Sequence, residues 1–540
     1  MEGAAAVRVR SGDAIQGCEA MRLGALGHAG LAVSTDSTRL LVDPWFDPHG
    51  GFLGSWFPYP DNAVALTPEV LDPDAVVVTH EHFDHLDPWF LAQLAPTVPV
   101  VVCQFPSFAL RDKILAAGER EIVELAPWER HRVGDLSVFF VPEESPMNHD
   151  AAAVVTHDDE AVVDLNDARL SPAQLREIRR EVGGRVDVLL LQGAGASWYP
   201  ICYEYPPERR RELSAQKRTA KLNYMVRAVG ATGPRVAVPF AGPPCFLDPA
   251  LAVHNQEMDE GIFPDLATVA DWLRPRVRAR VEVLLAGDTW DLTTTTREPE
   301  PSWQDFEWSR RDEYLAEYAA RRRTYLDEVW AAHPEPTRSL WPEFRAYFER
   351  LLAMNRYFLE RIDLRVGFDL SGPGGGRWSV DFRAGAPAVH PVLEDCQYVY
   401  RFDARWLPPI LDRTIGWEDF LLSLRFSAAR DPDVYNDHLL GILKFATPSA
   451  LAAVERFETS IDVEETITVA AGDRRYRIQR WCPHAGHDLS ETGRVLPGGV
   501  LQCLAHHYEF DLDSGQCLTG ACPALRTERL SDEPQPARPA

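Results

Sequence analysis

Two short loops near the C-terminus combine cysteine and histidine at spacings that suit metal binding. The first is Cys482-Pro483-His484, and the second, a β-hairpin's length later, is Cys503-Leu504-Ala505-His506. Two thiolates and two imidazoles in this order can hold a [2Fe–2S] cluster, with the cysteines on one iron and the histidines on the other. A zinc site could use the same four side chains, so the spacing alone does not decide the metal. A cluster of this kind moves single electrons, and we therefore expect the other half of a redox reaction elsewhere in the chain.

The residues around these loops favour the iron–sulfur interpretation. The stretches His484–His487 and Tyr508–Gly515 resemble the two loops that cover the cluster of a Rieske centre. We therefore predict a small all-β Rieske [2Fe–2S] domain at residues 456–527. The predicted cluster ligands are Cys482, His484, Cys503 and His506.

A second group of metal-binding side chains follows a predicted strand in the N-terminal half. The strand Ala75–Thr79 runs into the motif His80-Glu81-His82-Phe83-Asp84-His85, and a helix-like segment follows it. A loop that leaves a strand end can direct alternate side chains to one side and so present ligands to two adjacent metals. In this strand–loop–helix context the motif resembles the signature of the metallo-β-lactamase fold. The ligands that it predicts for a dinuclear centre are His80, His82, Asp84 and His85.

Other loops are needed to complete both metal sites. His149 lies directly before a predicted strand, and we expect it to join His80 and His82 at the first metal. Asp167 follows the Val162–Leu165 strand, at the place where a bridging carboxylate belongs. The sequence thus predicts ligands from at least three separate loops.

The last ligand and the identity of the metal stay open in the sequence. The ligand should follow the Val236–Phe240 strand, and either His254 or Asp248 qualifies. Asp43 is expected to accept a hydrogen bond from a ligand histidine and so to fix its tautomer. Imidazole and carboxylate ligands suit zinc, iron or manganese. We favour two iron ions, because an electron-transfer cluster would have nothing to reduce at a redox-silent zinc pair.

The N-terminal part resembles the catalytic part of the CMP-N-acetylneuraminate hydroxylase family. The matching stretches are Thr79–Leu86, Leu165–Asp167, Lys217–Tyr224 and Pro239–Gly242. That family combines a Rieske cluster with a metallo-β-lactamase-like domain and hydroxylates a C–H bond with dioxygen. The metal loop also resembles the diiron monooxygenases of this fold in bacterial natural-product pathways. Because the Rieske unit precedes the other domain in the hydroxylase family and follows it here, sialic acid is not carried over as the substrate.

The predicted organisation is multidomain. Strands alternating with helices indicate an αββα metallo-β-lactamase sandwich at residues 21–295, and Arg297–Pro301 reads as a linker. Residues 302–455 are expected to form a helical linker and an α+β module without a ligand cluster. Within this module, Leu351–Thr447 resembles sterol-carrier-like domains, which enclose apolar ligands. A proline-containing tail at 528–540 is expected to be disordered.

Composition bears on the partners and the compartment. The chain has 81 acidic and 55 basic residues and a formal net charge of −26, which disfavours nucleic acid or an anionic membrane as a partner. It shows neither a signal peptide nor an apolar stretch long enough to span a bilayer, so we expect a cytoplasmic protein. Whether it forms a homo-oligomer stays open.

Together the two metal motifs predict a monooxygenase that uses O2 to hydroxylate an unactivated C–H bond. No Asp-x-x-His-x4-His run for a mononuclear iron follows Cys503, so the oxygen chemistry is assigned to the N-terminal site. We expect electrons from NAD(P)H through a reductase or ferredoxin, and a small lipophilic substrate such as a natural-product or acyl intermediate. The alternative is a dinuclear zinc hydrolase with a redox-sensing Rieske domain. A non-catalytic electron carrier is a third interpretation, against which the complete ligand motif argues.

Overall fold

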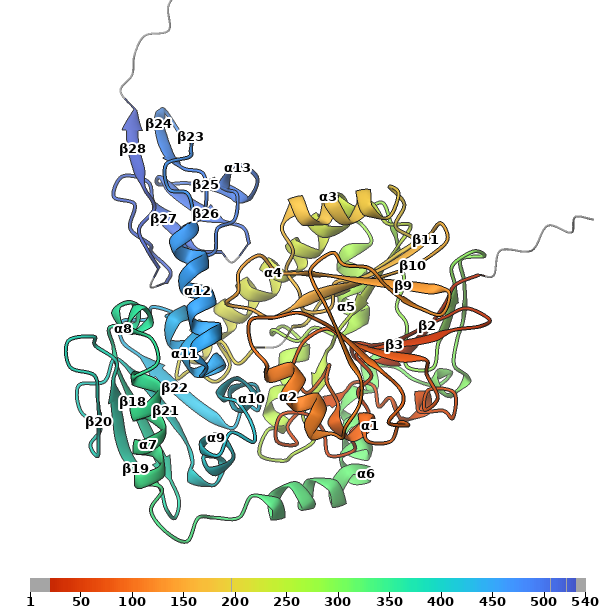
Figure 1. The fold of residues 1–540 in the computed structure, drawn as a ribbon, viewed down its shortest axis with the longest axis horizontal. Coiled ribbons are helices and arrows are strands. Elements are labelled where there is room, and N and C mark those ends of the chain that lie inside the picture. The colour runs from red at the N-terminus through yellow and green to blue at the C-terminus, as the bar shows by residue number, and fades with distance from the viewer. Residues whose placement is uncertain (1–19, 196, 506, 521, 531–540) are drawn as a thin grey trace, which may run out of the picture.

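A computed structural model describes residues 20–195, 197–505, 507–520 and 522–530. An N-terminal αββα sandwich, a central α+β module and a C-terminal β domain follow one another along the chain (Figure 1). Helix α6 (Arg311–Ala332) runs along the lower edge of Figure 1 from the sandwich to the module, and α12 (Pro448–Ser460) lies between the module and the C-terminal domain. Within the described ranges, no helix combines the length and apolar character needed to cross a bilayer.

The first sheet of the sandwich carries the predicted metal loop. In spatial order its strands are β17 (Thr296–Glu298), β16 (Thr289–Asp291), β1 (Arg22–Gly27), β2 (Gly30–Ser34), β3 (Arg39–Val42), β5 (Ala75–Val78), β6 (Val100–Cys103) and β7 (Ile122–Leu125). Strands β3, β5, β6 and β7 are parallel, so the loops that follow β3 and β5 leave the same edge of the sheet. Helices α1 (Pro88–Leu91) and α2 (Ala109–Ala116) cover its outer face through apolar side chains such as Phe90 and Ile114.

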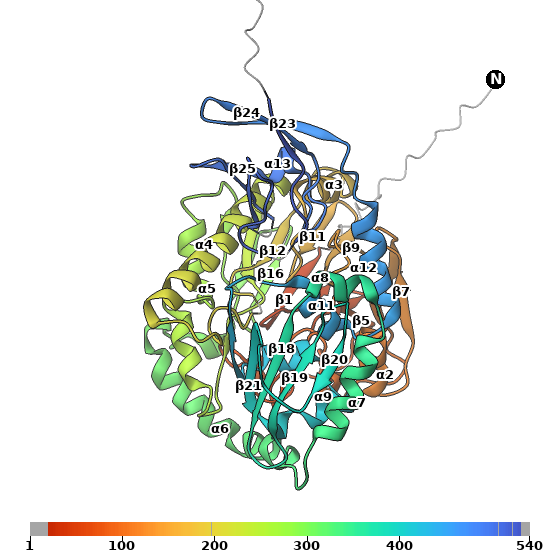
Figure 2. The ribbon, with the colours of Figure 1, turned by 90° about the vertical axis from the view of Figure 1, so that its left-hand side faces the viewer.

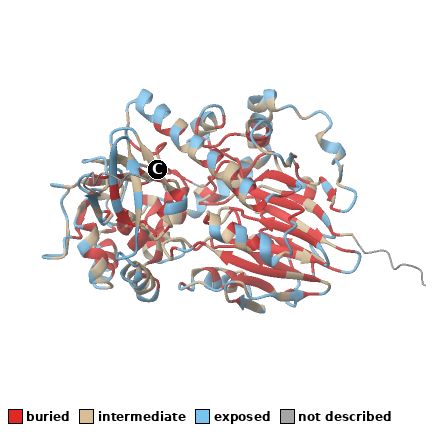
Figure 3. Cartoon of the chain, turned by 90° about the horizontal axis from the view of Figure 1, so that it is seen from above, coloured by how far each residue is buried: buried red, intermediate tan, exposed pale blue. Residues whose placement is uncertain are grey.

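The second sheet faces the first one. In spatial order its strands are β15 (Arg280–Val281), β13 (Val236–Phe240), β12 (Val188–Gln192), β11 (Glu160–Asp164), β10 (Ala151–His157), β9 (Leu136–Pro142) and β8 (His131–Val133). Its outer face is covered by α3 (Pro172–Glu181), α4 (Pro207–Thr232) and α5 (Leu266–Leu273), whose apolar side chains pack on the strands. The central strands of both sheets are buried nearly throughout (Figure 3). The remaining short elements of this half are β4 (Phe57–Pro58), β14 (Pro244–Cys245), η1 (Ala63–Ala65), η2 (Ala252–Met258), η3 (Pro301–Trp303) and η4 (Trp308–Arg310).

The stretch Arg297–Pro301, expected to be a linker, belongs in part to the first sheet. Its first residues form the edge strand β17, which pairs with β16. Arg297 forms an ion pair with the fully buried Asp288 (2.6 Å), and the Trp303 indole donates to the carbonyl of Ala286 (2.6 Å). These contacts extend the sandwich beyond residue 295, because a buried carboxylate needs its basic partner.

The central module is a five-stranded sheet covered by helices. Its strands in spatial order are β20 (Ala388–His390), β19 (Gly376–Asp381), β18 (Arg365–Ser371), β21 (Tyr398–Asp403) and β22 (Phe426–Arg430). Its helices are α7 (Trp341–Leu352), α8 (Arg356–Ile362), η5 (Ala404–Trp406), α9 (Pro408–Leu411), α10 (Trp417–Leu422) and α11 (Asp437–Phe445). The rings of Phe344, Phe348, Phe368 and Trp417 pack on one another inside the module, and Figure 2 shows α7 lying along this sheet.

One apolar core joins the sandwich to the module. It contains Trp45 and Phe57 of the sandwich, Tyr318 of α6, and Phe344 and Trp417 of the module. The C-terminal domain has a separate core around Tyr476 and Phe510. The first two parts of the chain therefore share their interior, whereas the third part does not.

The C-terminal domain consists of two small antiparallel sheets. One contains β23 (Thr466–Ala471), β24 (Arg474–Gln479) and β28 (Thr527–Leu530), and the other contains β25 (Gly493–Leu496), β26 (Val500–Cys503) and β27 (Glu509–Asp511); α13 (Leu489–Thr492) precedes β25. Residues 528–530, which were assigned to the disordered tail, instead pair with β24 as part of β28. Residues 531–540 lie outside the described part of the chain.

Candidate dinuclear metal centre and iron–sulfur site

The metal loop is fixed at its start by Asp43, which follows β3. The carboxylate of Asp43 accepts hydrogen bonds from the backbone N–H (2.8 Å) and the hydroxyl (2.5 Å) of Thr79, the residue after β5. Because β3 and β5 are parallel neighbours, both residues lie at the same edge of the sheet. Asp87 closes the loop by accepting from the N–H of Phe90 (2.9 Å) and so caps α1. The motif is thus held at both ends by buried carboxylates.

Asp43 also orients His85, as the sequence predicted for a ligand histidine. The Nδ1 atom of His85 lies 2.7 Å from Asp43 Oδ2, so Nδ1 donates to Asp43 and Nε2 is the nitrogen that a metal ion could bind. His85 Nε2 lies 3.3 Å from Asp167 Oδ1 and 3.8 Å from Asp84 Oδ2. Burial disfavours the charged imidazolium, but Asp84, Asp167 and Asp43 outweigh burial and hold the pKa of His85 well above its usual value. A metal cation at Nε2 would meet the same carboxylates.

His80 and His82 converge with Asp150, rather than with the predicted His149. His80 Nε2 lies 3.0 Å from His82 Nδ1 and 3.9 Å from Asp150 Oδ1, and ligand atoms of the three residues lie within 4.8 Å of one another. His149 points elsewhere: its Nδ1 is 3.6 Å from Glu81 Oε1. Asp150, rather than His149, is therefore the residue whose ligand atom lies beside those of His80 and His82.

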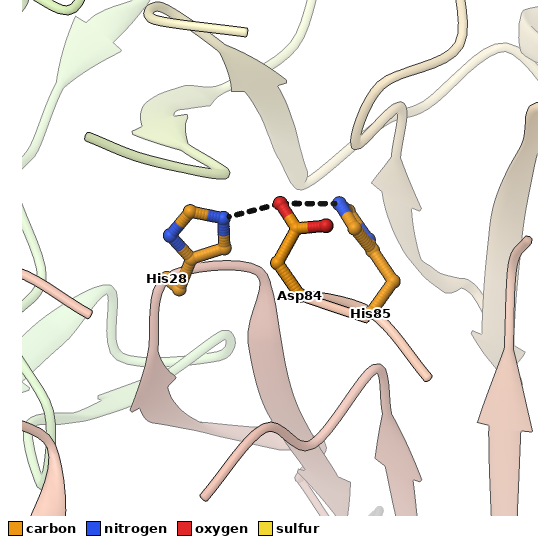
Figure 4. A group of neighbouring side chains, drawn as sticks. All are labelled: His28, Asp84 and His85. Atoms are coloured by element: carbon orange, nitrogen blue, oxygen red, sulfur yellow. Dashed lines mark hydrogen bonds and ion pairs between the residues drawn. The ribbon is translucent and has the colours of Figure 1, made fainter. Parts of the chain in front are cut away.

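His28, which the sequence did not single out, completes the second group. It lies in the turn between β1 and β2, and its Nε2 is 3.0 Å from Asp84 Oδ2 (Figure 4). Ligand atoms of His28, Asp84 and His85 all lie within 4.8 Å of one another. The N–H of Ala241 donates to the carbonyl of His28 (3.1 Å), so His28 lies beside the end of β13. A histidine from the β1–β2 turn thus lies where the sequence expected the last ligand.

The two residues predicted for that last position lie in other environments. Asp248 accepts from the Trp330 indole (2.9 Å) and forms a buried ion pair with Arg425 (2.9 Å). His254 lies in η2, where burial and the nearby Arg210 lower its pKa to about 4. Among the described residues, neither Asp248 nor His254 belongs to a group of converging ligand atoms.

The central module reaches into the metal site. Glu418 of α10 lies 3.1 Å from His82 Nε2, and Lys444 of α11 lies 2.9 Å from the same carboxylate of Glu418. Burial opposes the ionised form, but Lys444 and His82 lower the pKa of Glu418 to about 2. The ring of Phe445 lies 4.6 Å from that of His149. No spacing rule links these residues to the metal motif, so the sequence contained no signal for them.

The donor set fits metal ions. Asp84 Oδ1 and His85 Nε2 are buried without a hydrogen bond to any described residue, an arrangement that costs about 1–3 kcal/mol per group unless a ligand satisfies it. The loops around them are strained: the non-glycine residues His28, Asp43, Asn166 and Ala241 have φ values of 50°, 44°, 39° and 48°. Such strain persists where the surrounding structure requires it and is concentrated at functional sites.

The two loops of the C-terminal domain bring the predicted cluster cysteines together. Cys482 and Cys503 are buried free thiols that hydrogen-bond to each other, and that bond lowers the pKa of Cys503 to about 6. Each loop turns back on itself: the N–H of Cys482 donates to the carbonyl of His487 (2.8 Å), and the N–H of Cys503 donates to that of Tyr508 (2.8 Å). The same bond raises the pKa of Cys482 well above its usual value, and the adjacency of the two sulfurs fits the two cysteine ligands of one iron of the cluster. The fourth predicted ligand, His506, lies outside the described residues.

The remaining predicted cluster ligand contacts the central module. His484 Nε2 lies 3.1 Å from Asp437 Oδ2, and the His484 ring stacks on that of Tyr508 at 3.9 Å. Tyr508 also donates a hydrogen bond to Asp437. Because Asp437 engages Nε2, Nδ1 is the ring nitrogen of His484 that can bind iron.

The C-terminal domain also contacts the sandwich. Arg227 of α4 donates to the carbonyl of Leu504 (3.0 Å) in the second cluster loop. Arg176 of α3 forms an ion pair with Glu491 of α13 (2.6 Å). The domain that carries the cysteines therefore rests on both the module and the sandwich.

Comparisons with known proteins agree with this architecture. The model of a β-lactamase superfamily domain matches residues 38–240, and that of a Rieske [2Fe–2S] domain matches residues 446–528. A protein of Mycobacterium tuberculosis (strain H37Rv), named for a Rieske 2Fe-2S iron–sulfur centre, is 31% identical over 94% of this chain and 100% of its own length. A protein of the same description from Mycolicibacterium smegmatis is 30% identical over 94% of this chain and 100% of its own.

Solved structures are also similar to the chain. CmlA, a diiron beta-hydroxylase from Streptomyces venezuelae, matches 51% of this chain and 54% of its own at 18% identity, with a TM-score of 0.35. The metallo-beta-lactamase fold protein YhfI from Bacillus subtilis matches 50% of this chain and 99% of its own at 14% identity, with a TM-score of 0.34.

Proposed function

Because the chain belongs to the family of these mycobacterial Rieske 2Fe-2S iron–sulfur proteins, with a β-lactamase-superfamily domain before the Rieske domain, we propose that it is an O2-dependent monooxygenase. Its N-terminal centre would hold two iron ions, and its substrate would be hydroxylated at a C–H bond. The electrons would come from NAD(P)H through a reductase or ferredoxin. The reaction consumes the C–H compound, dioxygen, two electrons and two protons, and yields the alcohol and water.

One helix supports this proposal most directly, because it connects the two sites within a single chain. Asp437, the first residue of α11, contacts the cluster histidine His484. Lys444 lies at the other end of α11 and pairs with Glu418, which contacts His82. At about 1.5 Å per residue, α11 keeps its ends roughly 13 Å apart. No second protomer is needed to bring the cluster loop close to the metal loop.

The side chains of the chain itself prepare both sites. Asp43 accepts from Nδ1 of His85, and Asp437 engages Nε2 of His484, so each carboxylate would leave the other ring nitrogen to bind a metal ion. His80 and His85 are fully buried, so the protein excludes bulk water from the N-terminal centre. When bound, the iron ions would activate dioxygen and the cluster would supply electrons singly. The residues at the dinuclear centre would be His80, His82, Asp150, Asp84, His85, Asp167 and His28.

Metal analysis tests the proposal. Native protein should contain iron in excess of its [2Fe–2S] cluster, and Asp84→Ala should lose that excess while it keeps the Rieske EPR signal. After anaerobic reduction with dithionite, the cluster of Asp84→Ala should be reoxidised by O2 at least about tenfold more slowly than that of the wild type. Cys482→Ser is the complementary variant and should lose the EPR signal alone. Zinc in place of the excess iron would refute the monooxygenase and favour a hydrolase.

A further inference from the structure

Two lysines of α4 lie beside the metal loops without an acidic partner. Lys217 and Lys221 are one turn apart and project from the same face of the helix. Lys221 is only 7% exposed, and its ammonium donates to the amide oxygen of Gln192 (2.9 Å). Lys217 donates to the hydroxyl of Ser197. Within the described part of the chain, neither ammonium has a carboxylate oxygen within 4.0 Å.

Arg169 adds a third cation to this pair. It lies in the loop after β11, and its charge acts on both lysines. Burial and this like charge lower the pKa of Lys217 to about 7 and that of Lys221 well below its usual value. Lysine is almost never fully buried unless it is paired. Lys221 is buried and Lys217 and Arg169 are half-buried, and an anion supplied from outside the chain would favour the charged form of both lysines.

Lys221 and Arg169 line a small cavity that adjoins the metal site. Its lining includes Asp167, Arg169, Gln192, Lys221 and Tyr224. Gln192 links the two sites, because its amide N–H donates to Asp167 while its amide oxygen accepts from Lys221. Asp167 is the carboxylate 3.3 Å from His85 Nε2. A group held by Lys221 would therefore lie one side chain away from the predicted metal ligands.

The loop opposite α4 makes room for the Lys221 ammonium. Gly195 has a φ of +76°, and a Cβ atom at this position would lie 1.0 Å from Lys221 Nζ. The Lys221 ammonium thus occupies the space that a side chain at position 195 would need. The position of the ammonium is built into the loop and does not result from a flexible surface side chain.

A rival interpretation is that the lysines neutralise the metal ligands. The negative charges of Asp167 and Asp150 do raise the pKa of Lys221 and so counteract part of the lowering. However, those carboxylates would face metal cations in the loaded protein and would then offer little neutralisation to Lys221. The charge that acts on the Lys217 ammonium comes from Arg169, which has the same sign. Metal loading would therefore increase the need for an anion.

We propose that Lys217, Lys221 and Arg169 bind the oxyanion end of the substrate, a carboxylate or a phosphate, and so place its reacting carbon beside the metal loops. The inference rests on the proposed function for the reaction itself. It makes the substrate a small molecule with an anionic anchor, whereas the sequence suggested only a small lipophilic natural-product or acyl compound.

Binding of inorganic phosphate and of propionate to the metal-loaded full-length protein, measured by calorimetry, tests the proposal. Lys221→Met should weaken binding of the preferred anion at least about tenfold, as expected for a lost charged hydrogen bond, and should keep the wild-type metal content. Gly195→Ala should weaken binding similarly, because its methyl group displaces the ammonium. Arg211→Met is the matched control on α4, where an exposed Arg211 pairs with Glu208, and it should bind as the wild type does.

The other outcomes separate the sources of the anion and the competing explanations. Stronger binding of phosphate indicates a phosphorylated substrate, and stronger binding of propionate indicates a carboxylic acid. Wild-type anion binding by Lys221→Met, or loss of its metal, would overturn the proposal. So would a loss of binding in Asp84→Ala that Lys221→Met does not share, since the metals would then hold the anion. A zinc-loaded hydrolase would still bind the anion through Lys221. The anion-binding test can therefore refute this inference without refuting the monooxygenase, and the metal analysis can refute the monooxygenase without refuting this inference.

Discussion

At the scale of single residues, buried carboxylates decide what the histidines of the metal loop can do. Asp43 bonds both Thr79 and His85, so one side chain sets the position of the loop and the tautomer of a ligand. Burial raises the pKa of Asp43, and His85 and Thr79 counteract this effect by stabilising the ionised form. An amide at position 43 would donate as well as accept and could no longer specify which nitrogen of His85 is free.

His28 gives the clearest test at this scale. His28→Ala removes a nitrogen that lies 3.0 Å from Asp84, so we expect the metal held by Asp84 and His85 to bind at least about tenfold more weakly. Metal content after dialysis against a graded series of chelator concentrations measures this effect. His254→Ala is the control and should retain the wild-type content, because His254 lies in η2 beside Phe246. Equal metal content in both variants would exclude His28 as a ligand.

Some of these residues could be predicted from the sequence and others could not. The His80–His85 motif is contiguous, and its place after a strand indicates the fold and four candidate ligands at once. His28 and Asp150 are single residues whose importance depends on strand pairing and on which face of an extended segment each occupies. The sequence predicted His149, whereas the structure places its neighbour Asp150 beside His80 and His82, and spacing alone does not say which of two adjacent side chains faces a site.

At the scale of elements, α11 is the helix that joins the two sites. Its first residue, Asp437, carries a negative charge next to the predicted cluster ligand His484. A nearby negative charge stabilises the oxidised, more positive cluster and lowers its reduction potential. Only the tertiary structure shows which sites the two ends of this helix contact.

We therefore expect Asp437→Asn to raise the reduction potential of the cluster, by on the order of 60 mV if the charge changes the equilibrium tenfold. A redox titration followed by EPR measures this shift. Asp433→Asn changes an aspartate that pairs with Arg430 just before the same helix, and it should leave the potential unchanged. An unchanged potential in Asp437→Asn would show that Asp437 does not contact the cluster ligand.

The short helix η2 carries a histidine whose protonation affects stability. Burial and Arg210 lower the pKa of His254 to about 4 in the folded chain, whereas the unfolded chain protonates near 6.5. Between these values the unfolded state binds the extra proton, so the stability of the wild type should rise from pH 4 to pH 6.5, by at most about 3 kcal/mol. Urea unfolding of the wild type and of His254→Gln across this range measures the difference. Parallel pH profiles would contradict the assignment.

At the scale of the whole molecule, contacts of α11, Arg227 and Arg176 hold the C-terminal domain against the module and the sandwich. The αββα sandwich and the C-terminal Rieske domain follow from the sequence because each has a local ligand motif and alternating apolar strands. The contacts between them involve single residues on distant elements, and no pattern in the sequence predicts them. The contacts of the central module with the metal site, through Glu418 and Lys444, could not be predicted from the sequence for the same reason.

Mixing two inactive variants tests whether the sites of one chain work together. Asp84→Ala would lack a complete dinuclear centre and Cys482→Ser would lack the cluster. If electrons pass within a chain, an equimolar mixture should not recover the fast, O2-dependent reoxidation of the reduced cluster. Co-expression of the variants, which would allow mixed oligomers to form, should give the same result. Recovery to about half of the wild-type rate would show that transfer crosses between chains.

The core shared by Trp45, Tyr318 and Phe344 has a practical consequence for dissecting the protein. A fragment that ends after the sandwich would leave large aromatic rings in water and should aggregate when expressed. A fragment that ends after α12 keeps this shared apolar core intact. It loses only the C-terminal domain, which has its own apolar core around Phe510. The dinuclear centre can thus be purified and studied by spectroscopy without the iron–sulfur domain, but not without the module between them.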